Sequence, residues 1–399
     1  MAPSRSDSRP TRRNRSLLLR RPAATATLAL VLLAAGCSGS EGASGDDAPA
    51  TTGTAAPTVK YPGAAWDKVA PAAAGLDPAI LETIPTALEG SATDCVVVVK
   101  DGEVAYETTF NGFDVDKDKI VWSVSKSITS LLVGIAADEG KLRLDQPAAD
   151  FIPEWKGTPA EAVTIKHLLT MTSGRHFDYN SDFVVLPTRT DDQTAFSIGL
   201  AQDADPNTRW VYSNSAVQVL DAVISKATGQ STIDYAEKKL FAPLGIGATW
   251  LKDKVGHPWA YGGAEMSCRE LARIGHLMLH KGKWEDQQVV SEAWVDQSVR
   301  PSQELRSNYG LLWWLNTPEK PRPGAPADVQ TGDRVPGLAD NVYFARGMNG
   351  QFITVIPDKD MVVIRTGEKP ADKARFADEG KVLDRLLELV VKADQANPD

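Results

Sequence analysis

The sequence predicts an α+β fold in which an antiparallel sheet is built from both chain ends, with a large, mainly helical insertion between them. Strand-like patterns occupy residues 96–110 and return only after Asn341, whereas the stretch between them follows helical periodicity. The predicted domain spans residues 61–395, which is enough chain for a substantial hydrophobic core.

The strands are predicted from short apolar runs and the turn residues between them. Residues 96–100 and 103–110 flank Asp101-Gly102, a dipeptide that favours a type I′ hairpin turn. Three further strands are predicted at 342–346, 351–356 and 361–366, followed by a final helix at about 372–391. This last helix should cover one face of the sheet.

The helices of the insertion are predicted from apolar stripes that end at glycine. The stripe after Ser123 ends at Gly140, as expected for a core helix with a glycine C-terminal cap. Ser267 and Glu270 form a capping-box pattern at the start of another helix. The other predicted helices cover residues 164–171, 216–228 and 268–281.

The N-terminus has the pattern of a lipoprotein signal. Seven arginines and one aspartate accompany a short apolar run at 23–35, which ends in Leu33-Ala34-Ala35-Gly36-Cys37. This ending resembles a bacterial lipobox, which implies cleavage after residue 36 and a lipid anchor on Cys37; the alternative is an ordinary signal peptide cut near Ala35. Residues 37–60 are predicted to be a flexible linker. We therefore expect an extracytoplasmic protein tethered to the outer face of a bacterial membrane, or a secreted one.

Charge and metal-ligating residues limit the possible partners. Removing residues 1–36 would change the net charge from −9 to −15, which argues against nucleic-acid binding. His276 and His280 are spaced i, i+4, but no metalloprotease pattern surrounds them, so we predict no metal or other cofactor. Cys95 and Cys268 could pair in an oxidising compartment or remain single buried residues. The sequence does not indicate the oligomeric state.

Ser123 and Lys126 are the strongest candidate catalytic residues. They lie three residues apart at the start of a predicted helix, so their side chains share one face. A serine hydroxyl needs an adjacent base to attack a carbonyl. Lysine can act as that base if the positive helix end and partial burial favour its neutral form. This pair predicts a serine hydrolase.

Two later segments add candidates to this pair. In Tyr212-Ser213-Asn214, a phenol can relay a proton, and an amide can bind a substrate carbonyl and orient the lysine. In the late strand region, residues 346–351 contain two glycines, which suit a close approach of substrate backbone. An N–H from this strand, at Gln351, is predicted to complete an oxyanion hole with the N–H of Ser123.

Four segments, taken in order, resemble the motifs of the serine β-lactamase and penicillin-binding protein superfamily. They are Ser123-x-x-Lys126, residues 168–174 (LLTMTSG), Tyr212-Ser213-Asn214 and the glycine-rich strand. The resemblance is to its class C-like branch, which includes esterases and 6-aminohexanoate-oligomer hydrolases. It implies that Ser123 is acylated, that Lys126 is its proton partner, that Tyr212 is the second base, and that Asn214 is a polar support.

One motif departs from the family pattern. The family usually places Lys or His before Thr-Gly to recognise a substrate carboxylate, whereas this chain has Met348-Asn349-Gly350. Asn349 and Gly350 are predicted to contact substrate, and the missing cation favours neutral esters or amides over penicillins. The alternatives are a D-alanyl-D-alanine carboxypeptidase, a β-lactamase, or a penicillin-sensing or cell-wall-binding lipoprotein without turnover. An α/β-hydrolase is excluded because the sequence has no Gly-x-Ser-x-Gly.

Aromatic residues in the second half of the domain are candidates for cleft walls. We expect about two of the following to line the site and the rest to lie in the core: Phe177, Tyr179, Trp250, Trp259, Tyr261, Trp313 and Trp314. The substrate itself is expected to be a small or peptide-like ester or amide.

Overall fold

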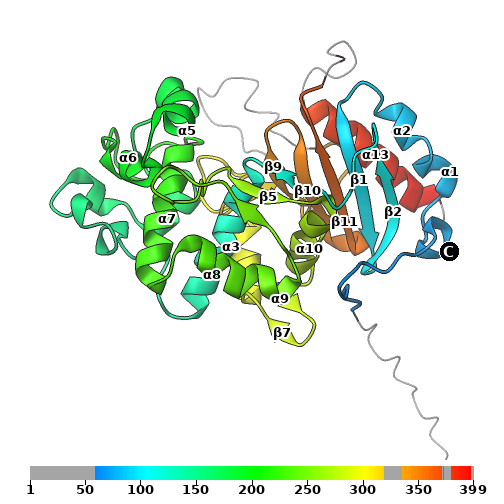
Figure 1. Ribbon diagram of the computed structural model, residues 1–399, viewed down its shortest axis with the longest axis horizontal. Coiled ribbons are helices and arrows are strands. Elements are labelled where there is room, and N and C mark those ends of the chain that lie inside the picture. Colours follow the sequence, from blue (N-terminus) through cyan, green and yellow to red (C-terminus); the bar gives the residue numbers. More distant parts are fainter. Residues whose placement is uncertain (1–58, 319–334, 371, 373–378, 397–399) are drawn as a thin grey trace, which may run out of the picture. The chain divides into compact units, whose positions relative to one another are not determined.

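The main sheet is antiparallel and has the strand order β2-β1-β11-β10-β9-β8 (Figure 1). The computed structural model describes residues 59–318, 335–370, 372 and 379–396. The strands of this sheet are β1 (Thr93–Lys100), β2 (Glu103–Thr109), β8 (Trp314–Leu315), β9 (Tyr343–Gly347), β10 (Gln351–Ile356) and β11 (Met361–Gly367). The first and last strands of the chain are neighbours, because β1 pairs with β11. This confirms a sheet built from both chain ends.

The predicted hairpin joins β1 and β2. Asp101 and Gly102 both have positive φ angles, 50° and 79°, as a type I′ turn requires. The short strand β8 was not predicted, because its two residues are too few for a recognisable strand pattern. Short strands also form two small sheets: β3 (Lys119–Ile120), β5 (Ala264–Met266) and β4 (Thr249–Trp250) in one, and β6 (Lys283–Trp284) and β7 (Gln287–Gln288) in the other.

Helices lie on both faces of the main sheet (Figure 1). One face packs against α3 (Val124–Asp138) and α10 (Cys268–Leu279), and the other against α1 (Pro78–Leu81), α2 (Ile84–Ala87) and α13 (Glu379–Ala396). Side chains alternate between the two cores along β1: Val97 and Val99 lie in the core on the side of α10, while Val96 and Val98 lie in the core on the side of α13. The final helix thus covers one face of the sheet as predicted, although residues 373–378 of its expected start lie outside the described residues.

The insertion between β2 and β8 is mainly helical, as predicted. Its longest helix besides α3 and α10 is α7 (Asn214–Thr228), which packs against α3 and ends at Gly229. The shorter helices are α4 (Ile165–Leu169), α5 (Leu186–Arg189), α6 (Gln193–Gly199), α8 (Thr232–Ala236), α9 (Ala242–Leu244) and α11 (Glu292–Ser298). Two π-helical segments, Ser181–Val185 and Glu237–Phe241, precede α5 and α9.

Several helix ends follow the capping chemistry expected from the sequence. The Ser267 hydroxyl accepts a hydrogen bond from the Glu270 N–H, and the Glu270 carboxylate accepts one from the Ser267 N–H, which is the predicted capping box. After α3, Gly140 adopts φ 69° and its N–H donates to Ala137 O.

Cys95 on β1 and Cys268 at the start of α10 form a disulfide. The sequence left this pairing open because 173 residues separate the two cysteines. The bond ties the sheet to the helix packed on it. His276, on the same helix, is buried and donates from Nε2 to Lys60 O; burial lowers its pKa to about 3. The structure thus places this histidine in a packed core position.

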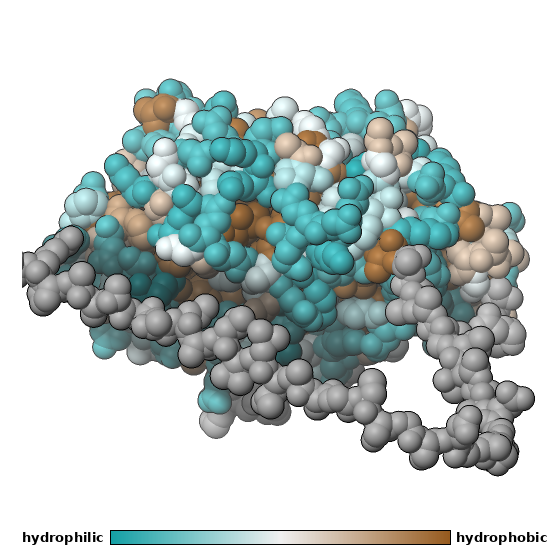
Figure 2. All heavy atoms as spheres, turned by 90° about the horizontal axis from the view of Figure 1, so that it is seen from below, coloured by the Kyte–Doolittle hydropathy of each residue, from teal (hydrophilic) through white to brown (hydrophobic). Residues whose placement is uncertain are grey.

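The predicted signal peptide, the lipidation site Cys37 and nearly all of the linker lie outside the described residues. Among the residues that are described, no helix is both long and apolar enough to cross a membrane. The face of the molecule shown in Figure 2 is mainly hydrophilic, with small separate hydrophobic patches.

Candidate active site

Ser123 lies at the N-terminus of α3, where its side chain is free to react. It is the N-cap residue, yet its hydroxyl makes no capping hydrogen bond. Instead, the Oγ atom lies 2.8 Å from the Nζ atom of Lys126, one helical turn away. The residue before it, Trp122, has φ 48°, a conformation that non-glycine residues rarely adopt. Such local strain at the entrance to a helix is typical of functional sites.

Lys126 is 1% exposed and has three oxygen partners. Besides Ser123 Oγ, its Nζ atom lies 2.7 Å from Asn214 Oδ1 and 2.8 Å from Tyr261 O. Burial lowers its pKa to about 7, although the negative charge of Asp182 opposes that shift. A neutral amine donates two hydrogens and keeps one lone pair. With Asn214 and Tyr261 as acceptors, that lone pair is directed at the Ser123 hydroxyl, so Lys126 can take its proton.

Tyr212 lies on the other side of the lysine. Its ring centroid is 4.9 Å from Lys126 Nζ, and its hydroxyl is hydrogen-bonded to Ser123. Burial raises the pKa of Tyr212 well above its ordinary value, and the charge of Asp182 adds to the effect. Tyr212 therefore rests as a phenol at neutral pH. It can donate a proton at once, but it can act as a base only after passing its own proton on.

Asn214 begins α7 and links this helix to the catalytic lysine. The preceding Ser213 is the N-cap, and its hydroxyl accepts a hydrogen bond from Ala216 N at 3.1 Å. This cap fixes the start of α7, and with it the Asn214 side chain that accepts from Lys126. The structure thus brings together Ser123, Lys126, Tyr212 and Asn214, four residues that the sequence singled out.

Asp182 is a buried carboxylate that the sequence did not single out. It accepts hydrogen bonds from Asn214 N at 2.7 Å and Ser215 N at 2.8 Å, and from the hydroxyls of Ser213 and Ser215. These bonds satisfy N–H groups at the positive end of α7. Asp182 is 1% exposed and belongs to the π-helical turn Ser181–Val185, 32 residues before Asn214. No local pattern marks it, because its role arises only from tertiary contact.

An aromatic cluster surrounds Tyr212. Trp314 stacks on it with ring centroids 5.6 Å apart, and Tyr309 meets both rings edge to face. Two guanidinium groups flank this cluster: that of Arg306 lies 6.0 Å from the Trp314 centroid, and that of Arg346 lies at the same distance. Positive charge thus comes close to the site from positions outside the Met348-Asn349-Gly350 motif.

The aromatic residues predicted as cleft walls lie in different environments. Trp314 and Tyr261 border the site, since the Tyr261 ring is 5.6 Å from Lys126 Nζ. Trp250 and Trp313 are buried in the core, and Tyr179 is exposed. The sequence missed Trp210, which meets the Tyr309 ring edge to face at 5.5 Å.

The end of β9 is the part of the sheet that approaches the nucleophile. A Cβ atom on Gly347 would lie 2.2 Å from Val121 O and 3.3 Å from Ser123 N, so this position requires glycine. The glycine allows the end of β9 to pack closely against the loop that leads into α3. Gln351 pairs with Gly347 across the hairpin, and its side chain binds Gly367. This geometry favours an N–H at the end of β9 over the predicted N–H of Gln351 as the second oxyanion donor.

Asn349 and Gly350 occupy the β9–β10 turn, and their described contacts are with protein groups. The Asn349 side chain donates to Glu368, and its N–H donates to Glu379. A Cβ atom on Gly350 would lie 2.1 Å from Nη1 of Arg365, whose guanidinium donates to the carbonyl oxygens of both turn residues. Gly350 makes room for the buried Arg365, a role that the sequence did not indicate.

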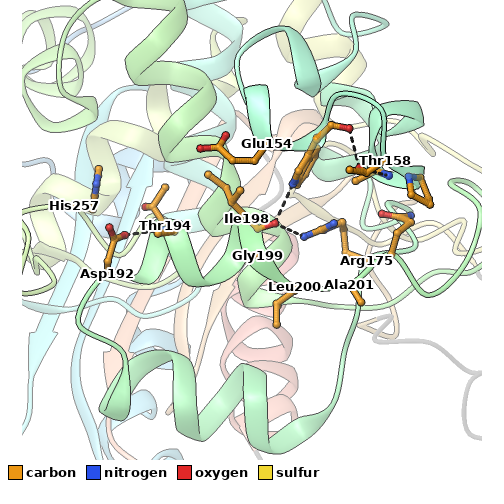
Figure 3. Close-up of a pocket in the computed structure, with 15 residues that line it drawn as sticks. Glu154, Thr158, Arg175, Asp192, Thr194, Ile198, Gly199, Leu200, Ala201 and His257 are labelled. Carbon is orange, nitrogen blue, oxygen red and sulfur yellow. Dashed lines mark hydrogen bonds between the residues drawn. The ribbon is translucent and has the colours of Figure 1, made fainter. Parts of the chain in front are cut away.

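A separate groove of about 600 Å³ runs along α6 (Figure 3). Trp155, Ile198 and His257 are among its lining residues, whereas Ser123, Lys126 and Tyr212 are not. Arg175 lies at one end of it and donates to the main-chain oxygens of residues 197 and 198. The groove is therefore distinct from the site built around Ser123.

Comparison with known proteins agrees with this geometry. Residues 82–384 match the model of the Beta-lactamase family, and the chain belongs to that family. It is a serine hydrolase that acts on ester or amide bonds.

Among similar proteins, a 6-aminohexanoate-dimer hydrolase from Paenarthrobacter ureafaciens is 26% identical over 319 residues, covering 72% of this chain and 76% of the relative. Penicillin-binding protein 4 of Amycolatopsis lactamdurans is 36% identical over 131 residues, which cover 31% of this chain and 33% of the relative.

Solved structures show the same fold at lower identity. EstCE1, a hydrolase with promiscuous acyltransferase activity, superposes with a TM-score of 0.61 at 14% identity, covering 78% of this chain and 99% of the other. The octameric penicillin-binding protein homologue from Pyrococcus abyssi gives a TM-score of 0.60 at 21% identity, covering 80% and 78% of the two chains.

Proposed function

We propose that this protein is an extracytoplasmic serine hydrolase that forms an acyl-enzyme on Ser123 and cleaves a carboxylic ester or amide. The observation that carries the proposal is the position of Lys126 Nζ, 2.8 Å from Ser123 Oγ and held by two further oxygen atoms. With its pKa lowered to about 7 by burial, this amine is a base at neutral pH.

Acylation begins when the Ser123 hydroxyl passes its proton to Lys126 and Oγ attacks the substrate carbonyl carbon. The negative charge on the carbonyl oxygen is stabilised by the Ser123 N–H and by an N–H at the end of β9, beside Gly347. The bond to the leaving group then breaks as Tyr212 gives it a proton. Tyr212 then recovers a proton from the ammonium group of Lys126, whose Nζ atom lies 4.9 Å from its ring centroid, so the proton lost by Ser123 ends on the leaving group.

Deacylation repeats these transfers with water in place of the leaving group. The neutral Lys126 accepts a proton from Tyr212 as the phenol takes one from water, and the resulting hydroxide attacks the ester carbon on Ser123. The bond between that carbon and Ser123 Oγ then breaks, and Oγ takes a proton from the ammonium group of Lys126, which restores the free enzyme. The pKa of Tyr212, raised by burial, makes this relay necessary, because a free phenolate would be rare at neutral pH. The retained Tyr212 favours turnover over a penicillin-sensing protein that acylates without release.

The substrate class is proposed from the third motif. Met348 and Asn349 are neutral where the family usually has a cation, so neutral esters and amides fit better than penicillins. The similarity to a 6-aminohexanoate-dimer hydrolase and to EstCE1 supports an amide or ester. A D-alanyl-D-alanine carboxypeptidase or a β-lactamase remains the alternative, supported by the similarity to penicillin-binding proteins.

The location is also a proposal. The pattern that ends at Cys37 supports lipidation and attachment to the outer face of a bacterial membrane. Cell fractionation of the wild type and of Cys37→Ser tests it. A processed Cys37→Ser protein that stays with membranes would contradict the proposed anchor.

The catalytic assignment is tested with Ser123→Ala in the domain that starts at residue 59. We expect the variant to lose hydrolysis of p-nitrophenyl acetate and covalent labelling by a fluorophosphonate, with an unchanged melting temperature, because only one hydroxyl is removed. Ser125→Ala on the same helical turn is the control and should keep the label on Ser123. Unchanged labelling of Ser123→Ala would refute the nucleophile, and labelling without steady-state turnover in the wild type would favour the penicillin-sensing alternative.

A further inference from the structure

Two exposed aromatic side chains belong to the chain segment that supplies Asp182 to the active site. In the part of the chain that the structure describes, the exposed large hydrophobic residues are Val59, Tyr179, Phe183, Val255 and Met348. Tyr179 is 70% exposed and Phe183 40%, and their rings stack with centroids 5.1 Å apart and planes at 20°. Exposed apolar side chains that cluster in this way are typical of a binding surface.

The aromatic pair is rigidly attached to the catalytic machinery. Phe183 directly follows Asp182, whose carboxylate accepts hydrogen bonds from Asn214 N and Ser215 N. Asn214 also donates from Nδ2 to the main-chain oxygen of Asp182, and it accepts from Lys126. One residue, Asp182, and one side chain, that of Asn214, therefore separate Phe183 from the catalytic lysine.

Local structure explains how one short segment points a carboxylate inward and a ring outward. Ser181–Val185 is a π-helical turn that leads into α5, and such turns are frequent at functional sites. Asp178 fixes its start by accepting a hydrogen bond from Ser181 N, and His176 binds the same carboxylate. The exposure of the two rings is thus part of an ordered structure.

The end of β9 also carries an exposed apolar residue. Met348 is 51% exposed and directly follows Gly347, the residue that lies against Ser123 N. Both chain segments that border Ser123 and Lys126 thus present apolar side chains to solvent, on a protein with a net charge of −9. A substrate held between them would remove this apolar surface from water.

We propose that Tyr179 and Phe183 form a subsite that binds the apolar acyl group of a neutral ester or amide. The inference rests on the proposed function and names its substrate class. The acyl side is assigned because Trp314 stacks on Tyr212, the proton donor to the leaving group, whereas the aromatic pair is connected through Asp182 to Asn214, which binds the base Lys126. Substrates with an extended apolar acyl chain should therefore be preferred to acetyl esters.

The test measures kcat/KM for p-nitrophenyl acetate, butanoate and hexanoate. In the wild type the value should rise with chain length, by up to about fourfold for each methylene group that becomes buried. In Tyr179→Ser/Phe183→Ser the rise should be lost, with acetate hydrolysis and the rate of fluorophosphonate labelling within about twofold of wild type. Val255→Ser removes an exposed apolar residue from another loop and should behave as the wild type.

Each other outcome contradicts the subsite. An unchanged chain-length dependence in the double variant would refute it. If the variant instead lost self-association in light scattering, or binding to phosphatidylglycerol vesicles, the patch would be an interface or a membrane contact. A chain-length effect confined to the alcohol side of alkyl esters would overturn the acyl assignment. Failure of the proposed function would look different, since Ser123→Ala would then hydrolyse acetate like the wild type.

Discussion

The two halves of the active site are assembled in different ways. Ser123 and Lys126 come from a single turn of α3, so their 2.8 Å contact follows from helix geometry and three residues of sequence. Tyr212 and Asn214 reach the same lysine from the start of α7, where Asp182, a residue from another segment, accepts hydrogen bonds from the main chain. One half is built by local structure, the other by tertiary contacts.

This difference separates the residues that carry out the reaction from the residues that adjust its rate and pH dependence. The α3 half supplies the nucleophile and the base, so substitutions there should remove the reaction itself. The α7 half orients the amine and adjusts its proton affinity, because the Asp182 charge raises the pKa of Lys126 against the effect of burial. Substitutions there should change the rate and its pH dependence while leaving the nucleophile intact.

The largest effect is expected for Lys126→Ala, which removes the base from the α3 half. Loss of a general acid–base group costs about 10²–10⁴-fold in rate. The double variant with Ser123→Ala should be no worse than either single variant, because the two residues form one catalytic unit. Measuring kcat/KM for p-nitrophenyl acetate checks this, with Lys141→Ala, near the other end of α3, as the control.

The wild-type pH profile sharpens the same prediction. Only the neutral amine accepts the serine proton, and burial places the pKa of Lys126 at about 7. Activity should therefore rise with pH through about 7 and level off above it. A rate that is flat between pH 6 and pH 8.5 would show that Lys126 is not the base.

A smaller effect is expected for Asp182→Asn, which acts on the α7 half. The asparagine NH₂ group cannot accept the hydrogen bonds that one carboxylate oxygen now accepts. We therefore expect kcat to fall about tenfold, which corresponds to the lower end of the free-energy range for losing a buried hydrogen bond to a charged group. Removing the negative charge should also lower the pKa of Lys126 further, which moves the rising limb of the pH profile to lower pH.

Asp221→Asn is the matched control for this variant. Asp221 is also 1% exposed and accepts hydrogen bonds from the hydroxyls of Thr194 and Thr232, within the same insertion. Both variants should lose stability, but only Asp182→Asn should shift the pH profile. If the two shifted it equally, Asp182 would have a purely structural role.

The sequence predicted the parts of the molecule that local patterns determine. The type I′ turn at Asp101-Gly102, the glycine cap after α7 and the Ser123–Lys126 pair all follow from short-range rules. It could not predict Asp182 or the interior role of Gly350, because these depend on residues far away in the chain. For the same reason, the sequence could not decide whether Cys95 and Cys268 form a disulfide.

The smallest predicted effect concerns Met348, at the one border of the site where the sequence departs from its family. A lysine there would offer a charge-assisted hydrogen bond to a substrate carboxylate, worth about 1.5–3 kcal/mol when buried and less at a side chain that is 51% exposed. Met348→Lys should thus shift the ratio of kcat/KM for nitrocefin to that for p-nitrophenyl acetate by roughly three- to tenfold towards nitrocefin.

The wild type should hydrolyse the neutral ester at least as well as nitrocefin, and Val255→Lys, which adds the same charge on another loop, should leave the ratio unchanged. A strong wild-type preference for nitrocefin would contradict the neutral-substrate proposal. The guanidinium groups of Arg306 and Arg346, which flank Trp314, would then be the source of carboxylate recognition. In that case Arg346→Gln should abolish the preference for nitrocefin, and Met348→Lys should add little to it. The two variants together therefore decide which side of the site recognises the substrate carboxylate.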